Sequence, residues 1–518
     1  MTTNGAVGVA DETIHLGSAA QFAAVRALFQ RVSYDEATIL PRLGIKEIFG
    51  YPRISDGRRT LTGPVEDATA ALVRLFLDGE AVDAALAQTL LGEDACAALE
   101  ALGLVRREAD GANRLRPTVF VVPVEGLWLA SDLIAGKRVD AATDRRDLVF
   151  PPASGLTGDY LATIPEAPGA RVLELCTGAG VTALRALRRG AREAWASDLV
   201  PRSVHFTRFN AALNDLSVTV VESDVYDGLG DETFDRIYAH PPYVPALAHE
   251  FDYRDAGADG EQVTQRIVEG LAAHLRPRGR ASLTCAMTDR DGKSVQDRLR
   301  GWLGAASPEF DVVVFQHRSW DLKHAYRRAT GGGADYADCE RWMRHFAALG
   351  IQQFALVSIE LRREARGRHP ITERRMGGAA VDAPAIDWAF TVARRLNDET
   401  VARVLPTLRP RVVPDLTAKI VLRSDVARDW HVAGAAVESE YPVAAALMLP
   451  PLAPTLLELC DGTRDTPALW KALGAAGLLT ADVTPTDIAR VVQMLLALGA
   501  VEVDGVPVPR HPVTRRRA

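Results

Sequence analysis

The sequence predicts a doubly wound α/β fold, in which helices cover both faces of a mostly parallel seven-stranded sheet. Three observations indicate this fold. Apolar strands alternate with amphipathic helices from about residue 168 to 365, a glycine loop joins the first of these strands to its helix, and similar helical patterns flank the region on both sides. Strands that alternate with helices form right-handed βαβ units and therefore a parallel sheet with covered faces.

The elements of this central region can be placed in chain order. The predicted strands are 171–175, 193–198, 218–224, 234–240, 280–287, 310–317 and 352–363. Amphipathic helices are expected between them at 181–190, 203–214, 260–275 and 294–304, with a helical insertion at 334–350. The spacing of the apolar residues supports these assignments. It is a short continuous run in each predicted strand, and it has helical spacing in the segments between the strands.

The flanking regions predict two accessory domains. Residues 66–106 contain three short helices followed by a strand, which with a β-ribbon would form a winged-helix-like domain. Residues 443–504 show the same order of helix, Asp-Gly, helix and a final Ala-Leu-Gly before a strand. We therefore predict an N-terminal domain at 1–146, the α/β core at 147–365, and a C-terminal winged-helix-like domain at 366–518. The last of these ends in a basic, disordered tail.

Composition excludes several classes of function. The 518 residues are 47% hydrophobic and carry a net charge of −7 with a pI near 5.9, which argues against a protein built to bind nucleic acid. The five cysteines are far apart and form no CxxC pair, so neither a disulfide framework nor a metal site is expected. There is no apparent signal peptide and no apolar run near 18 residues, so we expect a cytoplasmic protein without a membrane span.

The glycine loop of residues 172–187 (VLELCTGAGVTALRAL) predicts a ligand site. Gly178 and Gly180 let the backbone approach a ligand at the start of a helix, where unpaired N–H groups favour an anion. With Ala183 and Asp198 the loop also fits a dinucleotide fingerprint. By itself, the loop does not distinguish a nicotinamide or flavin cofactor from another adenosine-containing ligand.

Three carboxylates, one within a strand and two at strand ends, narrow the choice of ligand. Glu174 lies within the strand before the loop, where it would repel a pyrophosphate but could meet an ammonium group. Asp198 ends the second strand, suitably placed to accept hydrogen bonds from both hydroxyls of a ribose. Asp224 ends the third strand, where a side chain can reach an adenine amino group.

The segment after the fourth strand, His240-Pro241-Pro242-Tyr243, is stiff. Proline fixes its own φ and disfavours the helical region for the residue before it, so Pro241 restricts His240 as well. Tyr243 can stack on a flat group. We therefore expect this segment to form a rigid rim at the carboxyl edge of the sheet.

In combination these motifs resemble class I S-adenosylmethionine-dependent methyltransferases, which have a Rossmann-like fold. The resemblance covers residues 147–365 and is nearest to the glutamine N5-methyltransferases and the "methyltransferase small domain" group. Residues 254–280 also resemble the corresponding segment of the glutamine methyltransferases. The resemblance implies S-adenosylmethionine as cofactor, with its methionine end held by Glu174, Thr177, Gly178 and Gly180. By the same resemblance Asp198 would bind the ribose and Asp224 the adenine, and His240, Pro241, Pro242 and Tyr243 would face the methyl acceptor.

His240 departs from the Asn or Asp that this family usually has before Pro-Pro. An imidazole can orient an acceptor through one nitrogen, or take a proton from it. The acceptor expected first is a nitrogen, or an oxygen, of a protein or peptide, which the Gly-Ala-Asp-Gly sequence at 257–260 favours through the same resemblance. A small natural-product molecule with His240 as acid–base residue is the alternative. A guanine nitrogen of ribosomal RNA and a nicotinamide-dependent oxidoreductase are further alternatives, the RNA being disfavoured by the acidic charge balance.

Two other segments are candidates for the rim of this site. Residues 147–165 precede the first core strand and, by the same resemblance, could close over the cofactor, with Tyr160 packing there. Residues 316–333 mix aromatic, basic and histidine side chains before three glycines. They could form a mobile lid, or an ordinary solvated loop between the last two strands.

Overall fold

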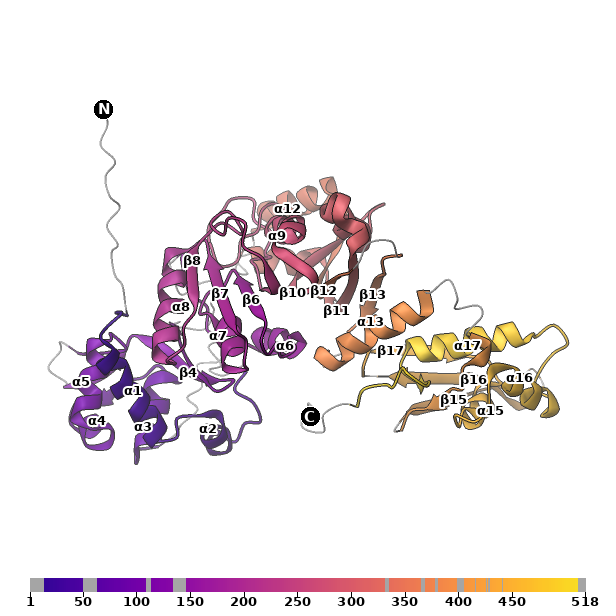
Figure 1. Cartoon of the computed structure of the whole chain (residues 1–518), viewed down its shortest axis with the longest axis horizontal. Helices are drawn as coiled ribbons and strands as arrows, with labels where there is room; N and C mark the ends of the chain where they lie inside the picture. The colour runs from indigo at the N-terminus through magenta and orange to yellow at the C-terminus, as the bar shows by residue number, and fades with distance from the viewer. Residues whose placement is uncertain are drawn as a thin grey trace. The chain divides into compact units, whose positions relative to one another are not determined.

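The structure is a computed structural model of the chain (Figure 1). It describes residues 14–49, 63–108, 113–133, 146–330, 335–364, 369–377, 381–397 and 405–510, except for single positions at 415, 425, 427, 428 and 440. The basic tail predicted from the sequence lies largely outside the described residues.

The largest sheet has eight strands in the order β13-β11-β12-β10-β9-β6-β7-β8. The strands are β6 (Arg171–Leu175), β7 (Glu193–Asp198), β8 (Thr219–Glu222), β9 (Phe234–Ala239), β10 (Leu275–Arg290), β11 (Phe310–Trp320), β12 (Ile351–Arg363) and β13 (Thr372–Met376). The mixed α/β class with a mostly parallel sheet is confirmed, but the prediction of seven strands was wrong by one. The additional strand, β13, pairs in parallel with β11 and contains three charged residues in a row, so it has no apolar run to reveal it.

The register of the parallel strands brings their carboxyl ends to one edge. Leu175 at the end of β6 pairs with Ser197 of β7 on one side and with Ala239 of β9 on the other. Asp198 pairs in turn with Glu222 of β8. Residues that follow these strands are therefore neighbours, although up to 65 positions separate them in sequence (175 to 240).

Helices alternate with these strands as predicted. They are α7 (Val181–Arg188), α8 (Pro201–Leu213), α9 (Gln262–His274), α10 (Val295–Leu303), α11 (Leu322–Ala329) and α12 (Tyr336–Ala348), with a short 3₁₀ segment η1 (Gly304–Glu309) after α10. Helix α7 packs on β6 and β7, and α8 packs on β7 and β8 (Figure 1). The predicted insertion at 334–350 is α12, and α11 is a second helix that precedes it.

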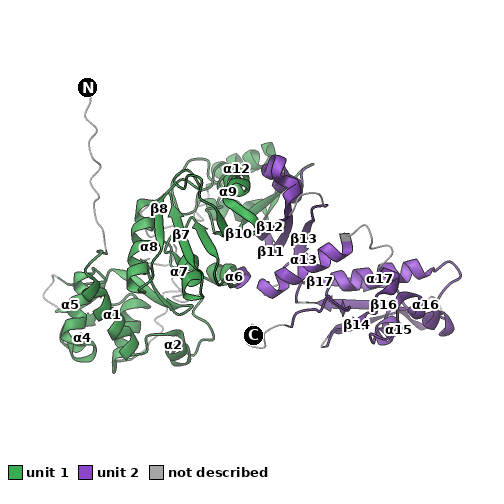
Figure 2. Cartoon of the chain, viewed as in Figure 1, with its two compact units in different colours: residues 1–161, 166–292, 320–354 green, residues 162–165, 293–319, 355–518 purple. Residues whose placement is uncertain are grey.

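The chain divides into two compact units (Figure 2), of which the first comprises residues 1–161, 166–292 and 320–354. Its N-terminal part contains α1 (Ala19–Arg31), α2 (Glu36–Leu43), α3 (Ala68–Phe76), β1 (Val82–Asp83), α4 (Ala84–Leu91), α5 (Glu93–Ala101), β2 (Val105–Arg107), β3 (Arg114–Pro117), β4 (Val119–Val124), β5 (Leu127–Asp132) and α6 (Gly155–Thr163). The small sheet has the order β1-β3-β2 and is antiparallel.

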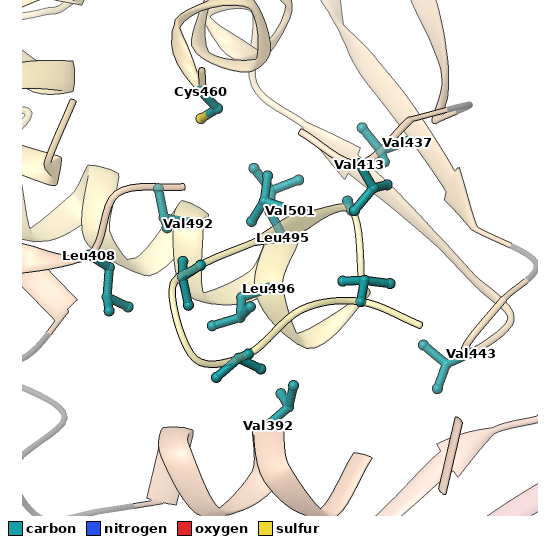
Figure 3. Packing of buried hydrophobic residues seen from close by; sticks show 14 of the residues in the cluster. Val392, Leu408, Val413, Val437, Val443, Cys460, Val492, Leu495, Leu496 and Val501 are labelled. Carbon is teal, nitrogen blue, oxygen red and sulfur yellow. The ribbon is translucent and has the colours of Figure 1, made fainter. Parts of the chain in front are cut away.

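The second unit comprises residues 162–165, 293–319 and 355–518, and it has its own apolar core (Figure 3). Its C-terminal part contains α13 (Ala383–Asn397), η2 (Leu405–Thr407), β14 (Arg411–Val412), β15 (Thr417–Ser424), β16 (Trp430–Ser439), β17 (Ala445–Leu449), α15 (Ala453–Leu459), α16 (Thr466–Ala475), α17 (Pro485–Ala497) and β18 (Val501–Glu502). Within the described residues of the chain, no helix is long and apolar enough to cross a membrane. The domain boundaries proposed from the sequence remain a prediction.

The two helical modules share a feature that explains their similar sequences. In each, an aspartate caps the second helix: Asp83 accepts the backbone N–H of Leu86 in α4, and Asp465 accepts that of Ala468 in α16. Each module then continues into a third helix and a short strand, β2 or β18. Because capping aspartates of this kind begin helices, the repeated pattern in the sequence corresponds to a repeated helix start.

Asn210 of α8 and Asn214, the residue that caps the end of this helix, fasten the antiparallel hairpin of β4 and β5 to the α/β core. Asn210 is fully buried; its Nδ2 donates to the carbonyls of Ala130 (3.0 Å) and Ala179 (2.9 Å), and its Oδ1 accepts the Ala130 N–H (2.7 Å). One turn later, Asn214 makes the same pair of bonds to the backbone of Trp128. The backbone N–H and C=O groups on the outer edge of β5 thus bond to asparagine side chains, as they would to the backbone of another strand.

Replacing Asn210 by alanine should strongly destabilise the first unit. The change leaves one buried N–H and two buried carbonyls without these partners, each at a cost of roughly 1–3 kcal/mol, so a loss of about 3 kcal/mol or more is expected. Chemical denaturation measures the loss, with Arg208→Ala on the exposed face of the same helix as control. A loss of under about 1 kcal/mol for Asn210→Ala would contradict this account.

Candidate functional site

A cavity of about 730 Å³ opens at the carboxyl edge of β6, β7, β8 and β9, within the first unit. Its volume is typical of ligand sites, which enclose about 300–1,000 Å³. Of the ten residues predicted from the sequence, the structure places nine in its lining: Glu174, Thr177, Gly178, Asp198, Asp224, His240, Pro241, Pro242 and Tyr243. The strand register therefore brings the predicted residues together.

Gly180 does not line the cavity. It has φ +83° at the start of α7, and a Cβ there would lie 2.8 Å from Cγ2 of Thr207. The Thr207 hydroxyl donates to the carbonyl of Gly178 at 3.0 Å. Gly180 thus allows α8 to approach the loop and to hold it, which is a different role from the direct ligand contact expected.

Glu174 is buried and fixes the start of α7. Its carboxylate accepts the backbone N–H groups of Thr182 (3.1 Å) and Ala183 (2.9 Å). The Thr177 hydroxyl donates to it as well, at 2.8 Å. Burial raises the pKa of Glu174, while these hydrogen bonds act in the opposite direction. The helix N-terminus, which in a dinucleotide-binding loop would meet the pyrophosphate, is here occupied by a protein carboxylate.

Asp198 and Gly178 form a second fixed point at the end of β7. The Gly178 N–H donates to Oδ2 of Asp198 at 2.9 Å, and the Val200 N–H donates to Oδ1 at 3.0 Å. Gly178 has φ +54°, and nothing lies within 4 Å of the point that a Cβ would occupy. Burial raises the pKa of Asp198 to about 6.

Asp224 follows β8 and is half exposed. Its Oδ1 accepts a hydrogen bond of 2.7 Å from Nη1 of Arg266 on α9, and the same guanidinium lies 3.7 Å from Asp227. Arg266 also lines the cavity. A group that binds Asp224 therefore also meets a cation.

His240 follows β9 between two aromatic rings. Its ring centroid lies 5.3 Å from that of Tyr160 on α6 and 6.0 Å from that of Tyr243, with the Tyr243 ring nearly parallel to it at 13°. Burial lowers the pKa of His240 to about 4. The imidazole is therefore neutral at physiological pH, with one donor and one acceptor nitrogen.

Two segments build the rim of the cavity. Several residues of 148–160 line it, among them Tyr160, which is where the sequence led us to expect them. The loop that follows the two prolines is fixed by backbone hydrogen bonds, from Val244 N–H to Arg254 O (2.8 Å) and from Ala256 N–H to Val244 O (3.0 Å). The described part of 316–333 contains a packed helix, α11, rather than an ordinary solvated loop.

Sequence reasoning missed the arginines of the site. Arg254, Arg266 and Arg328 all line the cavity, and they come from a loop, from α9 and from α11. The sequence holds many arginines, and nothing in the local pattern around these three distinguishes them. Only the helical spacing of α9 could have indicated that Arg266 faces the sheet edge rather than solvent.

Comparison with known proteins agrees with this geometry. A family model described as methyltransferase small domain matches residues 157–290. A release factor glutamine methyltransferase from Deinococcus radiodurans is 33% identical over 153 residues, which are 27% of this chain and 54% of that protein. The corresponding Escherichia coli protein is 28% identical over 183 residues, 35% of this chain and 61% of that protein.

Similarity to solved structures is weaker. A methyltransferase from Pyrococcus furiosus is 17% identical and covers 38% of this chain and 77% of that one, with a TM-score of 0.24, which is too low to carry an argument. The chain spans about half to three fifths of the length of the two relatives above. The matched region of this chain is a class I S-adenosylmethionine-dependent methyltransferase domain of the methyltransferase small domain group.

The residues of the cavity fit S-adenosylmethionine. Gly178 leaves open space beside the loop, and Asp198 and Asp224 line the cavity with carboxyl groups, which can accept hydrogen bonds from hydroxyl and amino groups such as those of an adenosine. When bound, this cofactor supplies an electrophilic methyl group on a sulfonium. Glu174, Asp198 and Asp224 place three carboxyl groups in this part of the lining, and in their ionised form these groups would favour a cationic ligand.

Cofactor affinity should fall when the pH is lowered through about 6. The pKa of Asp198 is raised to about 6, so its carboxylate is ionised above that pH and gains a proton below it. The protonated form is a poorer acceptor for ribose hydroxyls, and one proton taken up weakens binding by at most about tenfold per pH unit. Calorimetric titration of S-adenosylmethionine from about pH 5 to pH 8 measures the effect. Asp198→Asn should bind weakly at every pH, and an unchanged affinity in that variant would refute the ribose assignment.

Proposed function

We propose that the protein transfers a methyl group from S-adenosylmethionine to the side-chain amide nitrogen of a glutamine in a protein or peptide. The N–CH₃ bond would form as the sulfonium S–CH₃ bond breaks, S-adenosylhomocysteine would leave, and one amide proton would pass to solvent. The observation that carries this proposal is the position of the His-Pro-Pro-Tyr rim on the same cavity as Glu174, Asp198 and Asp224. The names of the relatives support the choice of glutamine, since both are release factor glutamine methyltransferases. The substrate itself is inferred for this chain.

The neutral state of His240 supports an orienting role. A side chain whose pKa is lowered to about 4 is a weak base, so it is poorly suited to remove a proton from the acceptor at physiological pH. A neutral imidazole can accept one hydrogen bond from a planar NH₂ group. Together with the stacked Tyr243 it would align the nitrogen lone pair with the methyl group, and alignment supplies most of the rate in such a transfer.

Glu174 argues against the nicotinamide-dependent alternative. A pyrophosphate at the N-terminus of α7 would compete with the carboxylate for the N–H groups of Thr182 and Ala183, and it would meet like charge. The net charge of −7 similarly disfavours ribosomal RNA as the acceptor. A small-molecule acceptor remains the second candidate, because His240 stands where glutamine methyltransferases usually have asparagine.

The helical modules on either side are proposed to be winged-helix-like and to hold the acceptor protein. The order α3-β1-α4-α5-β2-β3, with the sheet order β1-β3-β2, supports this interpretation for the N-terminal module. The capped helices α16 and α17 followed by β18 support it for the C-terminal module.

Labelled methyl from S-adenosylmethionine should enter the protein fraction of a host extract. The extract is separated into protein, RNA and small-molecule fractions after incubation with the enzyme, with Asp198→Ala as the inactive control. Label confined to the small-molecule fraction would show that the acceptor is a metabolite and not a protein. Label in RNA would contradict both the protein and the small-molecule acceptor.

Replacing His240 should separate orientation from proton transfer. His240→Ala should lower turnover by roughly 10²-fold, the scale expected when a reacting group loses its alignment, while cofactor affinity stays within about threefold. His240→Asn keeps one acceptor but no titrating group, so it should retain activity within about tenfold of the parent. Turnover is measured on the labelled fraction identified above. If the asparagine variant were as slow as the alanine variant, His240 would act by proton transfer; near-parent activity in His240→Ala would remove it from the mechanism.

A further inference from the structure

The cavity contains one cation that the proposed function leaves unexplained. Three arginines line it, and two have carboxylate partners: Arg254 is paired with Asp255 at 2.9 Å, and Arg266 with Asp224 at 2.7 Å. Arg328 has no ion pair with any carboxylate of the residues described here. Its guanidinium lies instead 5.4 Å from the ring centroid of Trp320 and 6.0 Å from that of Tyr243.

The backbone of Arg328 is held firmly. Helix α11 begins at Asp321, which accepts the N–H of His324 at 2.7 Å, and it packs through Ala325, Tyr326 and Ala329 against α12 and β12. The buried Arg254 donates to the carbonyls of Arg328 (3.5 Å) and Ala329 (2.8 Å) at the end of the helix. The backbone position of Arg328 is therefore set by a buried ion pair and an apolar cluster, and its guanidinium is placed by the rings of Trp320 and Tyr243.

The same cluster ties α11 to the acceptor rim. Val244, which directly follows the His-Pro-Pro-Tyr segment, is buried in this cluster with Ala325 and Phe346, and Tyr243 packs against the cluster. Tyr243 contacts both His240 and Arg328. Its ring is nearly parallel to that of His240, and the Arg328 guanidinium lies over the same ring. The cation thus lies beside the site proposed for the acceptor nitrogen.

We propose that Arg328 binds a carboxylate of the methyl acceptor, so that the preferred peptide carries an acidic residue close to the methylated glutamine. A guanidinium stacked on aromatic rings keeps its N–H edge available for a bidentate pair with a carboxylate. A single arginine suits one negative charge, whereas phosphate groups are usually bound by arginine clusters. This inference rests on the proposed function for the identity of the acceptor. It adds that Arg328 determines which peptide sequences around the glutamine are preferred.

The test uses two pools of synthetic peptides with one central glutamine. In the acidic pool the flanking positions hold Asp or Glu, and in the neutral pool they hold Asn or Ser. Binding to the full-length enzyme is measured by fluorescence anisotropy of labelled peptides, and methyl transfer is measured in parallel. The variants are Arg328→Gln, Arg328→Lys and, as matched control, Arg327→Gln at the exposed neighbouring position, which does not line the cavity.

The parent should bind the acidic pool more tightly by roughly tenfold to a hundredfold, the range that a charge-assisted hydrogen bond supplies. Arg328→Gln should lose this preference, while Arg328→Lys keeps part of it and Arg327→Gln keeps all of it. Cofactor affinity and the unfolding midpoint of Arg328→Gln should match the parent, which would show that the loss is local.

Equal binding of the two pools by the parent, or an unchanged preference in Arg328→Gln, would overturn the inference. Because binding is read separately from methyl transfer, the two proposals can fail independently. A preference that depends on Arg328, without methylation of either pool, would support the acidic subsite and count against glutamine as the methylated residue.

Discussion

The buried carboxylate of Glu174 is the constraint on which the site depends. It satisfies the N–H groups of Thr182 and Ala183, which a helix start would otherwise leave without partners, and it accepts the Thr177 hydroxyl in addition. Since these groups come from β6, the loop and α7, one side chain fixes the geometry of all three. The same carboxylate would compete with a pyrophosphate for these N–H groups, so the interaction that stabilises the loop also disfavours a dinucleotide.

The geometry of the proposed cofactor end follows from this fixed loop. With its backbone set, the Gly178 N–H points to Asp198, and Thr207 of α8 holds the Gly178 carbonyl from the other side. Asp198 therefore has both oxygens engaged by backbone donors while it lies in a buried environment that raises its pKa. A carboxylate held in this way is ready to accept hydroxyl groups without rearranging, which is the physical meaning of preorganisation.

The proposed acceptor end is rigid for a different reason. Two prolines restrict the backbone after β9. The two ends of the loop 244–256 are joined by backbone hydrogen bonds between Val244 and residues 254 and 256. Arg254 then joins this loop to the end of α11, so that His240, Tyr243 and Arg328 are held by one connected structure. The distribution of charge is consistent with two functions in one cavity: carboxylates gather where a cationic cofactor would lie, and a cation with no carboxylate partner among the described residues stands on the acceptor side.

The sequence by itself determined the α/β class, the order of its strands along the chain and nine of the residues that line the cavity, because strand ends and glycine turns are local signals and parallel strands bring their ends to one edge. It did not reveal β13, whose charged residues hide it, or the role of Gly180, which depends on how closely α8 approaches. Only the tertiary structure decided that Glu174 binds a helix start, that His240 is neutral, and that Arg254, Arg266 and Arg328 meet at the site. Burial and long-range pairing set these properties, and neither can be read from a local pattern.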